Sequence, residues 1–308
     1  MKVVFMGTPD FAVPCLEALI SNGYEVTLCV TQPDKPKGRS QVLTPPPVKV
    51  TALEKNIPVF QPKSMKTEET YEVLKNACAD VFIVVAFGKI LPQSVLDIPK
   101  YGCINIHASL LPKYRGAAPI QWSIAGGETV TGVTSMQMDA GLDTGDMLIS
   151  AETPITDDEN GESLHDKLSV LGAEVLIETL KKVQDGSVIK TKQDDSLSNY
   201  APMITKENTR IDFTKSAKEV RNLVRAMNPF PGAYTELGGK KVKIFSCEIT
   251  DIKAETPGKI VKVCDDCFCI SCADVAVKVC MLQLEGKKRM CASDFLKGKK
   301  LSVGDMFN

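Results

Sequence analysis

Short apolar runs alternate with helix-like segments through the first half of this 308-residue chain. The run VFIVVA at 81–86 is continuous and rich in β-branched residues, which is typical of a strand buried on both faces of a parallel sheet. This alternation predicts an α/β fold with a doubly wound, mostly parallel, Rossmann-like sheet. The strands are expected at 2–6, 24–30, 81–86, 103–107, 132–138 and 147–152, with helices at 11–21, 47–55, 67–77, 117–125 and 162–184.

The second half of the chain follows a different pattern. Residues 187–209 are polar and lack periodicity, which predicts a linker with an extended path. Ser216 and Glu219 form a capping box at the start of a helix. From residue 233 short strands dominate, with a hairpin signal at Gly238-Gly239, and about five strands in about 80 residues suit a small closed barrel of the OB type. The expected division is a catalytic domain at 1–186, a linker at 187–205 and a barrel domain at 206–308.

Composition narrows the class of protein. Apolar residues make up 44% and charged residues 24% of the chain, which is typical of globular proteins in water. No apolar run is long enough to span a bilayer, so no membrane association is expected. The first strand starts at residue 2 and leaves no room for a signal peptide, and the 11 cysteines are an odd number. We therefore expect a cytoplasmic monomer with reduced thiols.

Charge is distributed unevenly along the chain. Residues 206–308 carry 19 Lys and Arg against 13 Asp and Glu, a net charge of +6, whereas the remainder carries a net charge of −7. A basic domain beside a mildly acidic one indicates a polyanionic partner, although ordinary surface charge also gives such a balance. Residues 32–49 hold five prolines together with basic residues, which predicts either a generic surface loop or a loop that orders on binding.

Two motifs resemble ligand sites but have the wrong spacing. The turn after the first strand, GTPDF, is not the Gly-x-Gly-x-x-Gly of a dinucleotide site, so neither NAD nor FAD is expected. The segment CDDCFCISC at 264–272 begins as Cys-x-x-Cys but lacks the second pair, or the histidines, of a structural zinc site. We interpret its cysteines as small strand residues, and we expect no metal.

The strand CINIH at 103–107 carries an unusual polar pair. Asn105 and His107 share one face because strand side chains alternate, and they lie near the carboxyl end, where open α/β sheets bind ligands. A Gly-rich loop supplies three carboxylates, Asp139, Asp143 and Asp146, one of which can reach the imidazole if the flanking strands are neighbours.

An imidazole, an amide and a carboxylate together suit one class of chemistry. A carboxylate favours the charged imidazole, and an amide can donate a hydrogen bond to a developing oxyanion. Because the set itself contains no Ser or Cys nucleophile, it predicts direct acyl transfer without a covalent enzyme intermediate. Alternatively, these polar residues only form hydrogen bonds to backbone groups or stabilise turns.

Longer motifs carry a resemblance to a known family. NIHASLLPKYRGAAPIQWSI and TGVTSMQMDAGLDTGDML, with MGTPDFAVPCLEAL, AFGKILP and NPFPGA, resemble the formyltransferases that use 10-formyltetrahydrofolate. The similarity spans nearly the whole chain and is closest to the branch that formylates methionyl initiator tRNA. The Asn-x-His…Ser-Leu-Leu-Pro pattern alone does not identify the acceptor. The alternatives are therefore a nucleotide-sugar N-formyltransferase and a non-catalytic RNA-binding protein.

This resemblance implies a reaction and a set of site residues. The formyl group would pass from 10-formyltetrahydrofolate to the α-amino group of methionyl initiator tRNA, giving N-formylmethionyl-tRNA for translation initiation. Asn105 and protonated His107 would stabilise the oxyanion, and Asp143 would hold His107 charged and oriented. The implied folate-binding residues are Phe87, Gly88, Lys89, Ile90, Leu91, Ser109, Leu110, Leu111 and Pro112, with Ile90 and Leu91 as apolar walls. The implied tRNA-binding residues are Lys35, Lys37 and Arg39 in segment 32–49 and Lys240, Lys241 and Lys243 in the barrel.

Overall fold

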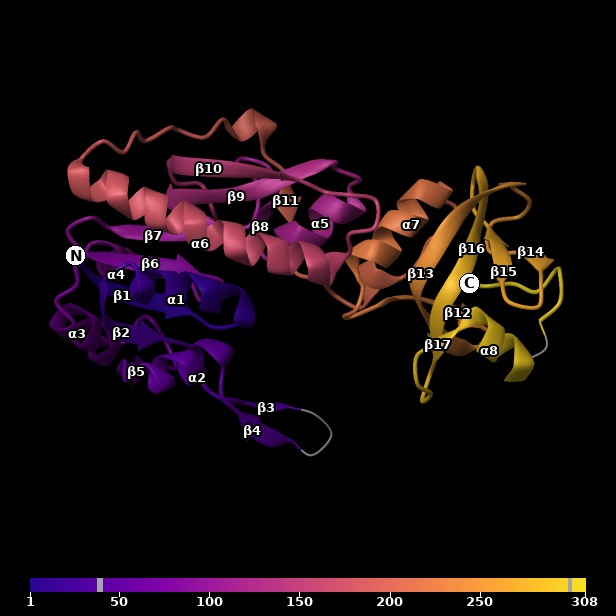
Figure 1. The fold of residues 1–308 in the computed structure, drawn as a ribbon, viewed down its shortest axis with the longest axis horizontal. Coiled ribbons are helices and arrows are strands. Elements are labelled where there is room, and N and C mark those ends of the chain that lie inside the picture. Colours follow the sequence, from indigo (N-terminus) through magenta and orange to yellow (C-terminus); the bar gives the residue numbers. More distant parts are fainter. Residues whose placement is uncertain (38–40, 299–300) are drawn as a thin grey trace. The chain divides into compact units, whose positions relative to one another are not determined.

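The computed structural model describes residues 1–37, 41–298 and 301–308. Within them the chain forms two compact units (Figure 1). Unit 1 contains Met1–Pro119, Val130–Pro154 and His165–Ala201, and unit 2 contains Ile120–Thr129, Ile155–Leu164 and Pro202–Asn308.

Unit 1 is built on a sheet with the strand order β10-β9-β7-β6-β1-β2-β5. The five strands from β7 to β5 pair in parallel, which confirms the mostly parallel sheet. β9 pairs antiparallel with β7, and β10 pairs antiparallel with β9, so the sheet is mixed at one edge. The strands are β1 (Lys2–Gly7), β2 (Glu25–Val30), β5 (Val59–Phe60), β6 (Val81–Val85), β7 (Cys103–His107), β9 (Val130–Gln137) and β10 (Met147–Pro154).

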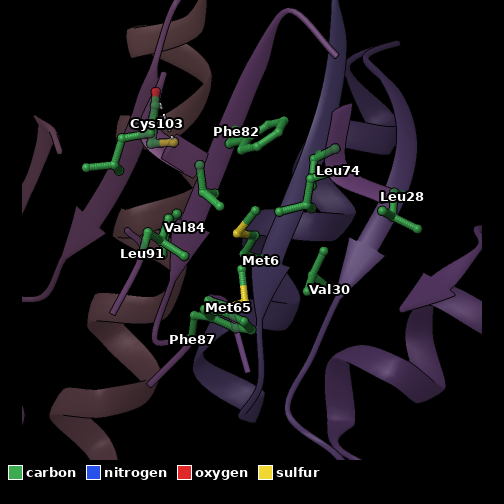
Figure 2. Packing of buried hydrophobic residues seen from close by; sticks show 13 residues of the cluster. Met6, Leu28, Val30, Met65, Leu74, Phe82, Val84, Phe87, Leu91 and Cys103 are labelled. Atoms are coloured by element: carbon green, nitrogen blue, oxygen red, sulfur yellow. Dashed lines mark hydrogen bonds between the residues drawn. The ribbon is translucent and has the colours of Figure 1, made fainter. Parts of the chain in front are cut away.

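Helices cover both faces of this sheet. On one face α6 packs closely, since a side chain added at Gly172 would contact Ile106, Cys15 of α1 and Val133. On the other face α3 and α4 close an apolar cluster that includes Met6, Val84 and Cys103 (Figure 2). The helical segments of unit 1 are η1 (Asp10–Ala12), α1 (Val13–Ser21), α2 (Pro47–Glu54), α3 (Glu68–Asn76), α4 (Gln93–Leu96), η2 (Asp195–Leu197) and most of α6 (Gly161–Asp185).

Segment 32–49 has more structure than its sequence predicts. Its described part contains an antiparallel ribbon, in which β3 (Lys35–Lys37) pairs with β4 (Val42–Thr44). At the base of the ribbon, Nζ of Lys49 lies 2.9 Å from Oδ1 of Asp34. This contact, followed by the hydrogen bond from Gln61, lowers the pKa of Asp34. The ion pair between Lys49 and Asp34 therefore fixes the start of the ribbon to the rest of unit 1.

Unit 2 contains the antiparallel strands expected after residue 233. Their order is β12-β13-β16-β15-β14, with β17 beside β16. Bridges from Leu237 to Phe307 and from Lys259 to Met306 join the two outer strands through the C-terminal residues, which closes the barrel. The elements are α5 (Pro119–Ala125), η3 (Glu207–Thr209), α7 (Ala217–Ala226), β12 (Ala233–Leu237), β13 (Lys240–Lys253), β14 (Ile260–Val263), β15 (Phe268–Ser271), β16 (Val275–Leu284), β17 (Met290–Cys291) and α8 (Ala292–Gly298).

Two local predictions for this unit are confirmed. Ser216 and Glu219 form the expected capping box at the start of α7. Gly238 and Gly239 form the hairpin turn between β12 and β13, both with positive φ, which glycine adopts without strain. The residues at these two positions thus determine where α7 begins and where the chain turns between β12 and β13.

The cysteine-rich segment 264–272 contains the turn after β14, the whole of β15 and the residue that follows β15. Cys267, Cys269 and Cys272 are buried and free, and Cys264 is half-buried. Burial raises the pKa of Cys272 to about 12. Among the described residues, no group of three or more His, Cys, Asp or Glu side chains is placed to hold a metal ion, and the metal-free protein stays a prediction. None of the helices in the described ranges has the length and apolar character needed to cross a membrane.

Candidate active site

The polar pair of β7 lies on the sheet face that carries the α3–α4 cluster. Cys103, Asn105 and His107 alternate with Ile104 and Ile106, so the three share this face, with Cys103 inside the apolar cluster. His107 is 6% exposed, and Asn105 is half-buried. One strand therefore places a thiol in the core and presents an amide and an imidazole farther along.

Asp143 reaches this pair from an unexpected direction. Because β9 runs antiparallel to β7, the loop 138–146 leaves the sheet beside the start of β7 and extends back over Asn105. Nδ2 of Asn105 donates to Oδ1 of Asp143 at 3.3 Å, and Oδ2 lies 3.7 Å from Nδ1 of His107. Asp143 adopts a positive φ of 53°, a conformation that Asp tolerates better than most residues.

The segment after β7 supports both members of the His–Asp pair through its backbone. Nε2 of His107 lies 2.9 Å from the carbonyl oxygen of Tyr114. A carbonyl oxygen can only accept, so Nε2 carries a proton, and Nδ1 is the nitrogen that faces Asp143. The backbone N–H of Gly116 donates to Oδ2 of Asp143 at 2.9 Å. The imidazole and the carboxylate are thus each held by residues 114–116.

The other two carboxylates of the loop have different surroundings. Asp139 is exposed, and its Oδ1 accepts hydrogen bonds from Gly141 N and from Thr144 Oγ1, so it stabilises the loop itself. Asp146 is half-buried, and its carbonyl oxygen accepts from Gln137 N at 2.8 Å. Of the three candidates from the sequence, the structure brings Asp143 to the imidazole.

The segment Phe87–Leu91 follows β6, which is parallel to β7 with Val84 opposite Asn105, so the chain leaves β6 beside the polar pair. Phe87 is 2% exposed and Leu91 is also buried, and both belong to the apolar cluster (Figure 2). Ile90 is 79% exposed. Of the two expected apolar walls, Ile90 is therefore the one whose side chain reaches the surface.

Polar contacts hold the backbone of this segment. Gln32 Nε2 donates to Phe87 O at 3.0 Å, and it lies where a side chain on Gly88 would have to be. Gly88 has a φ of 73°, which favours glycine, and a side chain there would displace the amide of Gln32. Nζ of Lys89 donates to the carbonyl oxygens of Pro62 and Lys63. Burial, followed by repulsion from Lys35, lowers the pKa of Lys89.

Residues 109–112 form a tightly bonded turn. The hydroxyl of buried Ser109 donates to Lys113 O at 2.6 Å, and Thr134 Oγ1 donates to Ser109 O at 2.8 Å. Leu111 is buried, and its N–H donates to Thr134 Oγ1. Leu110 and Pro112 are half-buried. The polar groups named here bond within the protein, so they brace the turn between β7 and residues 114–116.

The basic residues expected to bind tRNA are only partly described. Lys35 donates from Nζ to Gln32 Oε1 at 2.7 Å, Lys37 ends β3, and Arg39 lies outside the described residues. In the barrel Lys240 is exposed beside the hairpin turn, and Nζ of Lys241 lies 3.9 Å from the centre of the Tyr234 ring.

Lys243 differs from its two neighbours. Its Nζ donates to Pro231 O at 2.6 Å. Burial, and then repulsion from Lys241 and Arg289, lowers the pKa of Lys243. Lys241, Lys243 and Arg289 therefore lie close enough to repel one another, and the ammonium of Lys243 is already bonded to a carbonyl oxygen.

Sequence reasoning missed one group of residues at the site. Gln193 is 6% exposed, and its Nε2 donates to the carbonyl oxygens of Asp143 and Gly145 at 2.8 and 2.7 Å. It lies in the polar stretch interpreted as a linker, which has no periodicity to mark it. Arg115, which bonds to Gln193, stands in the family motif YRGAAP, but no spacing rule indicates its partner.

Comparison with known proteins places these residues in a family. Residues 1–180 match the family model for formyl transferase, and residues 203–300 match the model for the formyl transferase C-terminal domain. The chain is 51% identical to the methionyl-tRNA formyltransferase of Geotalea uraniireducens over 99% of this chain and 97% of that relative. It is 48% identical to that of Ruminiclostridium cellulolyticum over 99% of both chains.

Solved structures agree on the fold. HypX from Aquifex aeolicus in complex with tetrahydrofolic acid matches with a TM-score of 0.66 and 20% identity, and this chain spans about half its length, covering 100% of this chain and 50% of that one. The N-formyltransferase from Helicobacter canadensis matches with a TM-score of 0.67 and 20% identity over 91% of this chain and 98% of that one. Both family models and the full-length relatives lead to one assignment. The chain belongs to the methionyl-tRNA formyltransferases of the formyl transferase family.

Proposed function

We propose that the chain transfers the formyl group of 10-formyltetrahydrofolate to the α-amino group of methionyl initiator tRNA. The observation that carries this proposal is the full-length identity of 51% to a methionyl-tRNA formyltransferase. The cluster of Asn105, His107 and Asp143 supports the reaction class, because an amide, an imidazole and a carboxylate suit acyl transfer. A nucleotide-sugar acceptor is the weaker alternative, because the sugar N-formyltransferase from Shewanella sp FDAARGOS_354 matches the chain at only 17% identity.

The folate supplies the formyl group, and the residues of the site have distinct roles toward it. The α-amino nitrogen forms a bond to the formyl carbon while the bond from that carbon to N10 breaks, and one proton of the amine passes through water to N10. Asn105 Nδ2 and His107 Nδ1 both border Asp143, so either can donate a hydrogen bond to negative charge that develops on the formyl oxygen. Asp143 places a negative charge beside Nδ1 and keeps this nitrogen directed into the site.

The segments around this cluster fit a folate co-substrate. Gly88 and Lys89 offer backbone groups beside the carboxyl end of β6, and Ile90 offers exposed apolar surface, backed by buried Phe87 and Leu91. Ser109, Leu110, Leu111 and Pro112 would border the folate from the β7 side. HypX, whose structure contains tetrahydrofolic acid, has the same fold, which supports this choice of co-substrate.

The acceptor tRNA would meet two basic regions. Segment 32–49, with Lys35, Lys37 and Arg39, would approach the acceptor end, and Lys240, Lys241 and Lys243 would contact phosphates. In this proposal residues 1–186 are the catalytic domain, 187–205 the linker and 206–308 the tRNA-binding domain.

A transfer assay with competing acceptors tests the proposed function. Purified protein is given 10-formyltetrahydrofolate with methionyl initiator tRNA, methionyl elongator tRNA or an amino-sugar nucleotide. We expect rapid formylation of the initiator tRNA and little of the other two. Formylation of the amino sugar alone would assign the chain to the alternative function, and failure with every acceptor would exclude the enzyme function.

A further inference from the structure

Residues 191–201, called the strap below, join the two loops of the site. At one end, Thr191 and Met147 exchange backbone hydrogen bonds of 2.9 and 2.8 Å, directly after loop 138–146. At the other end, β11 (Tyr200–Ala201) pairs in parallel with β8 (Arg115–Gly116). The strap therefore holds both the loop that carries Asp143 and the segment that supports His107.

Gln193 connects the strap to the backbone of Asp143. The two hydrogens of its amide nitrogen match the two carbonyl oxygens within its reach, on Asp143 and Gly145. Asp143 has a positive φ, which carries some strain even for Asp, and the bond from Gln193 to its carbonyl oxygen helps to hold that conformation. Gln193 is buried, so these bonds are protected from competition by water.

Arg115 fixes the orientation of this amide. Its Nε and Nη2 lie 3.0 and 2.8 Å from Oε1 of Gln193, and Nη2 also lies 2.8 Å from Oδ1 of Asp195. A guanidinium has only donors, so the oxygen of Gln193 must face Arg115 and its nitrogen must face the loop. The forked contact, with an Arg115 side chain that is 11% exposed, leaves the amide one orientation.

Arg115 also lies between the two backbone groups that support the His–Asp pair. The carbonyl of Tyr114 accepts from His107, and the N–H of Gly116 donates to Asp143. The contact between Arg115 and Gln193 thus connects the backbone segment that holds the imidazole of His107 with the side chain that holds the loop of Asp143. We propose that Gln193 and Arg115 are positioning residues that hold Asp143 against His107; for catalysis this inference rests on the proposed function.

Kinetics of matched variants give the first test. Gln193→Ala should lower kcat for formyl transfer about 10²-fold, with little change in KM for either substrate, because a misplacement of about 1 Å costs that much. Gln184→Ala, an exposed glutamine of α6, should have wild-type kinetics. Gln193→Glu keeps the acceptor for Arg115 but loses the donors to the loop, so it should be at least as impaired as Gln193→Ala.

A double-mutant cycle separates positioning from independent structural roles. If Gln193 and Arg115 act as one unit, Arg115→Ala combined with Gln193→Ala should be no worse than the more impaired single variant. Multiplied losses in the double variant, or a loss confined to KM, would contradict the inference.

The second test does not depend on activity. The chain has only two histidines, so the imidazole ¹⁵N resonances of His107 and His165 can be assigned and compared at pH 7. We expect Gln193→Ala and Gln193→Glu to move the His107 resonances toward those of Asp143→Asn while leaving His165 unchanged. Unchanged His107 resonances in folded Gln193 variants, when Asp143→Asn does move them, would overturn the inference. If the wild-type protein formylates no acceptor but these shifts occur, the proposed function fails and the positioning role stands.

Discussion

The backbone N–H of Gly116 donates a 2.9 Å hydrogen bond to Oδ2 of Asp143. The same oxygen faces Nδ1 of His107 at 3.7 Å, so one glycine amide sets the position of the carboxylate relative to the imidazole. Gly116 has a φ of 118°, and a side chain there would meet the Tyr200 ring and the carbonyl oxygen of Ala201. The site therefore depends on a close approach of two backbones, which only glycine permits.

Removing the charge of Asp143 should impair catalysis severely. Asp143→Asn keeps the size of the side chain but removes the negative charge that lies 3.7 Å from Nδ1 of His107, so kcat should fall about 10²-fold or more. Asp139→Asn is the matched control, because Asp139 accepts hydrogen bonds only from its own loop among the contacts described. Steady-state kinetics of both variants compare them directly. A larger loss for Asp139→Asn than for Asp143→Asn would contradict the assignment.

Much of the fold follows from patterns that act locally. The continuous apolar run at 81–86 became the buried strand β6, and the capping box at Ser216 and the Gly238-Gly239 hairpin formed where expected. Asn105 and His107 could be paired from strand alternation alone. These features depend on neighbours within a few residues, which a single sequence displays.

The remaining features depend on partners distant in the chain. Because β9 is antiparallel to β7, loop 138–146 leaves the sheet beside the start of β7 and not beside its end. No local pattern in the sequence specifies this direction. The choice of Asp143 over Asp139 and Asp146 came from the family resemblance rather than from spacing. Gln193 bonds to carbonyl groups about 50 residues away in the chain. The polar segment around it has the sequence pattern of a linker, so nothing local indicates these bonds.

The basic face of the barrel should bind tRNA through phosphates. Lys241→Ala should weaken tRNA binding broadly and lower the slope of log K against log salt by about 1. Lys278→Ala is the control, because Nζ of Lys278 already lies 3.2 Å from Glu248 on the same barrel. Titrations at several salt concentrations measure both slopes. Equal slopes for Lys241→Ala and the wild type would exclude a phosphate contact at this position.

Arg39 should act differently from the barrel lysines. The residue lies outside the described residues, so the prediction follows from its place in the basic segment 32–49 of the catalytic half. Arg39→Ala should slow single-turnover transfer to initiator tRNA more than it weakens tRNA binding, and folate affinity should be unchanged. Purely additive binding losses, with normal transfer at saturation, would show that Arg39 is one more phosphate contact.

Acid should remove one stabilising contact of unit 2. Asp274 accepts hydrogen bonds from the backbone N–H groups of Ala217 and Val275 at 2.7 and 2.8 Å, and these bonds, Ala217 first, lower the pKa of Asp274. A lowered pKa in the folded state gives stability that is present above the unfolded pKa and is lost as the pH falls through the folded value.

Asp274→Ala should therefore destabilise the protein most at neutral pH. Because Asp274 is exposed, we expect a loss of only about 0.5 kcal/mol in the free energy of unfolding at pH 7, and a smaller loss near pH 3. Asp265→Ala, at an exposed turn, is the control. Urea unfolding at both pH values measures the difference, and an equal loss at the two would contradict the role of the charged carboxylate.

The role of His107 is tested most directly by the single-turnover rate of formyl transfer in His107→Ala, with wild-type protein as reference. Both substrates, 10-formyltetrahydrofolate and methionyl initiator tRNA, are supplied at saturation, so that binding does not limit the rate. We predict a rate constant about 10²–10³-fold below the wild-type value, as for loss of one oxyanion donor, with unchanged circular dichroism and tRNA affinity. A folded His107→Ala protein that transfers the formyl group at a near-normal rate would contradict the proposed site.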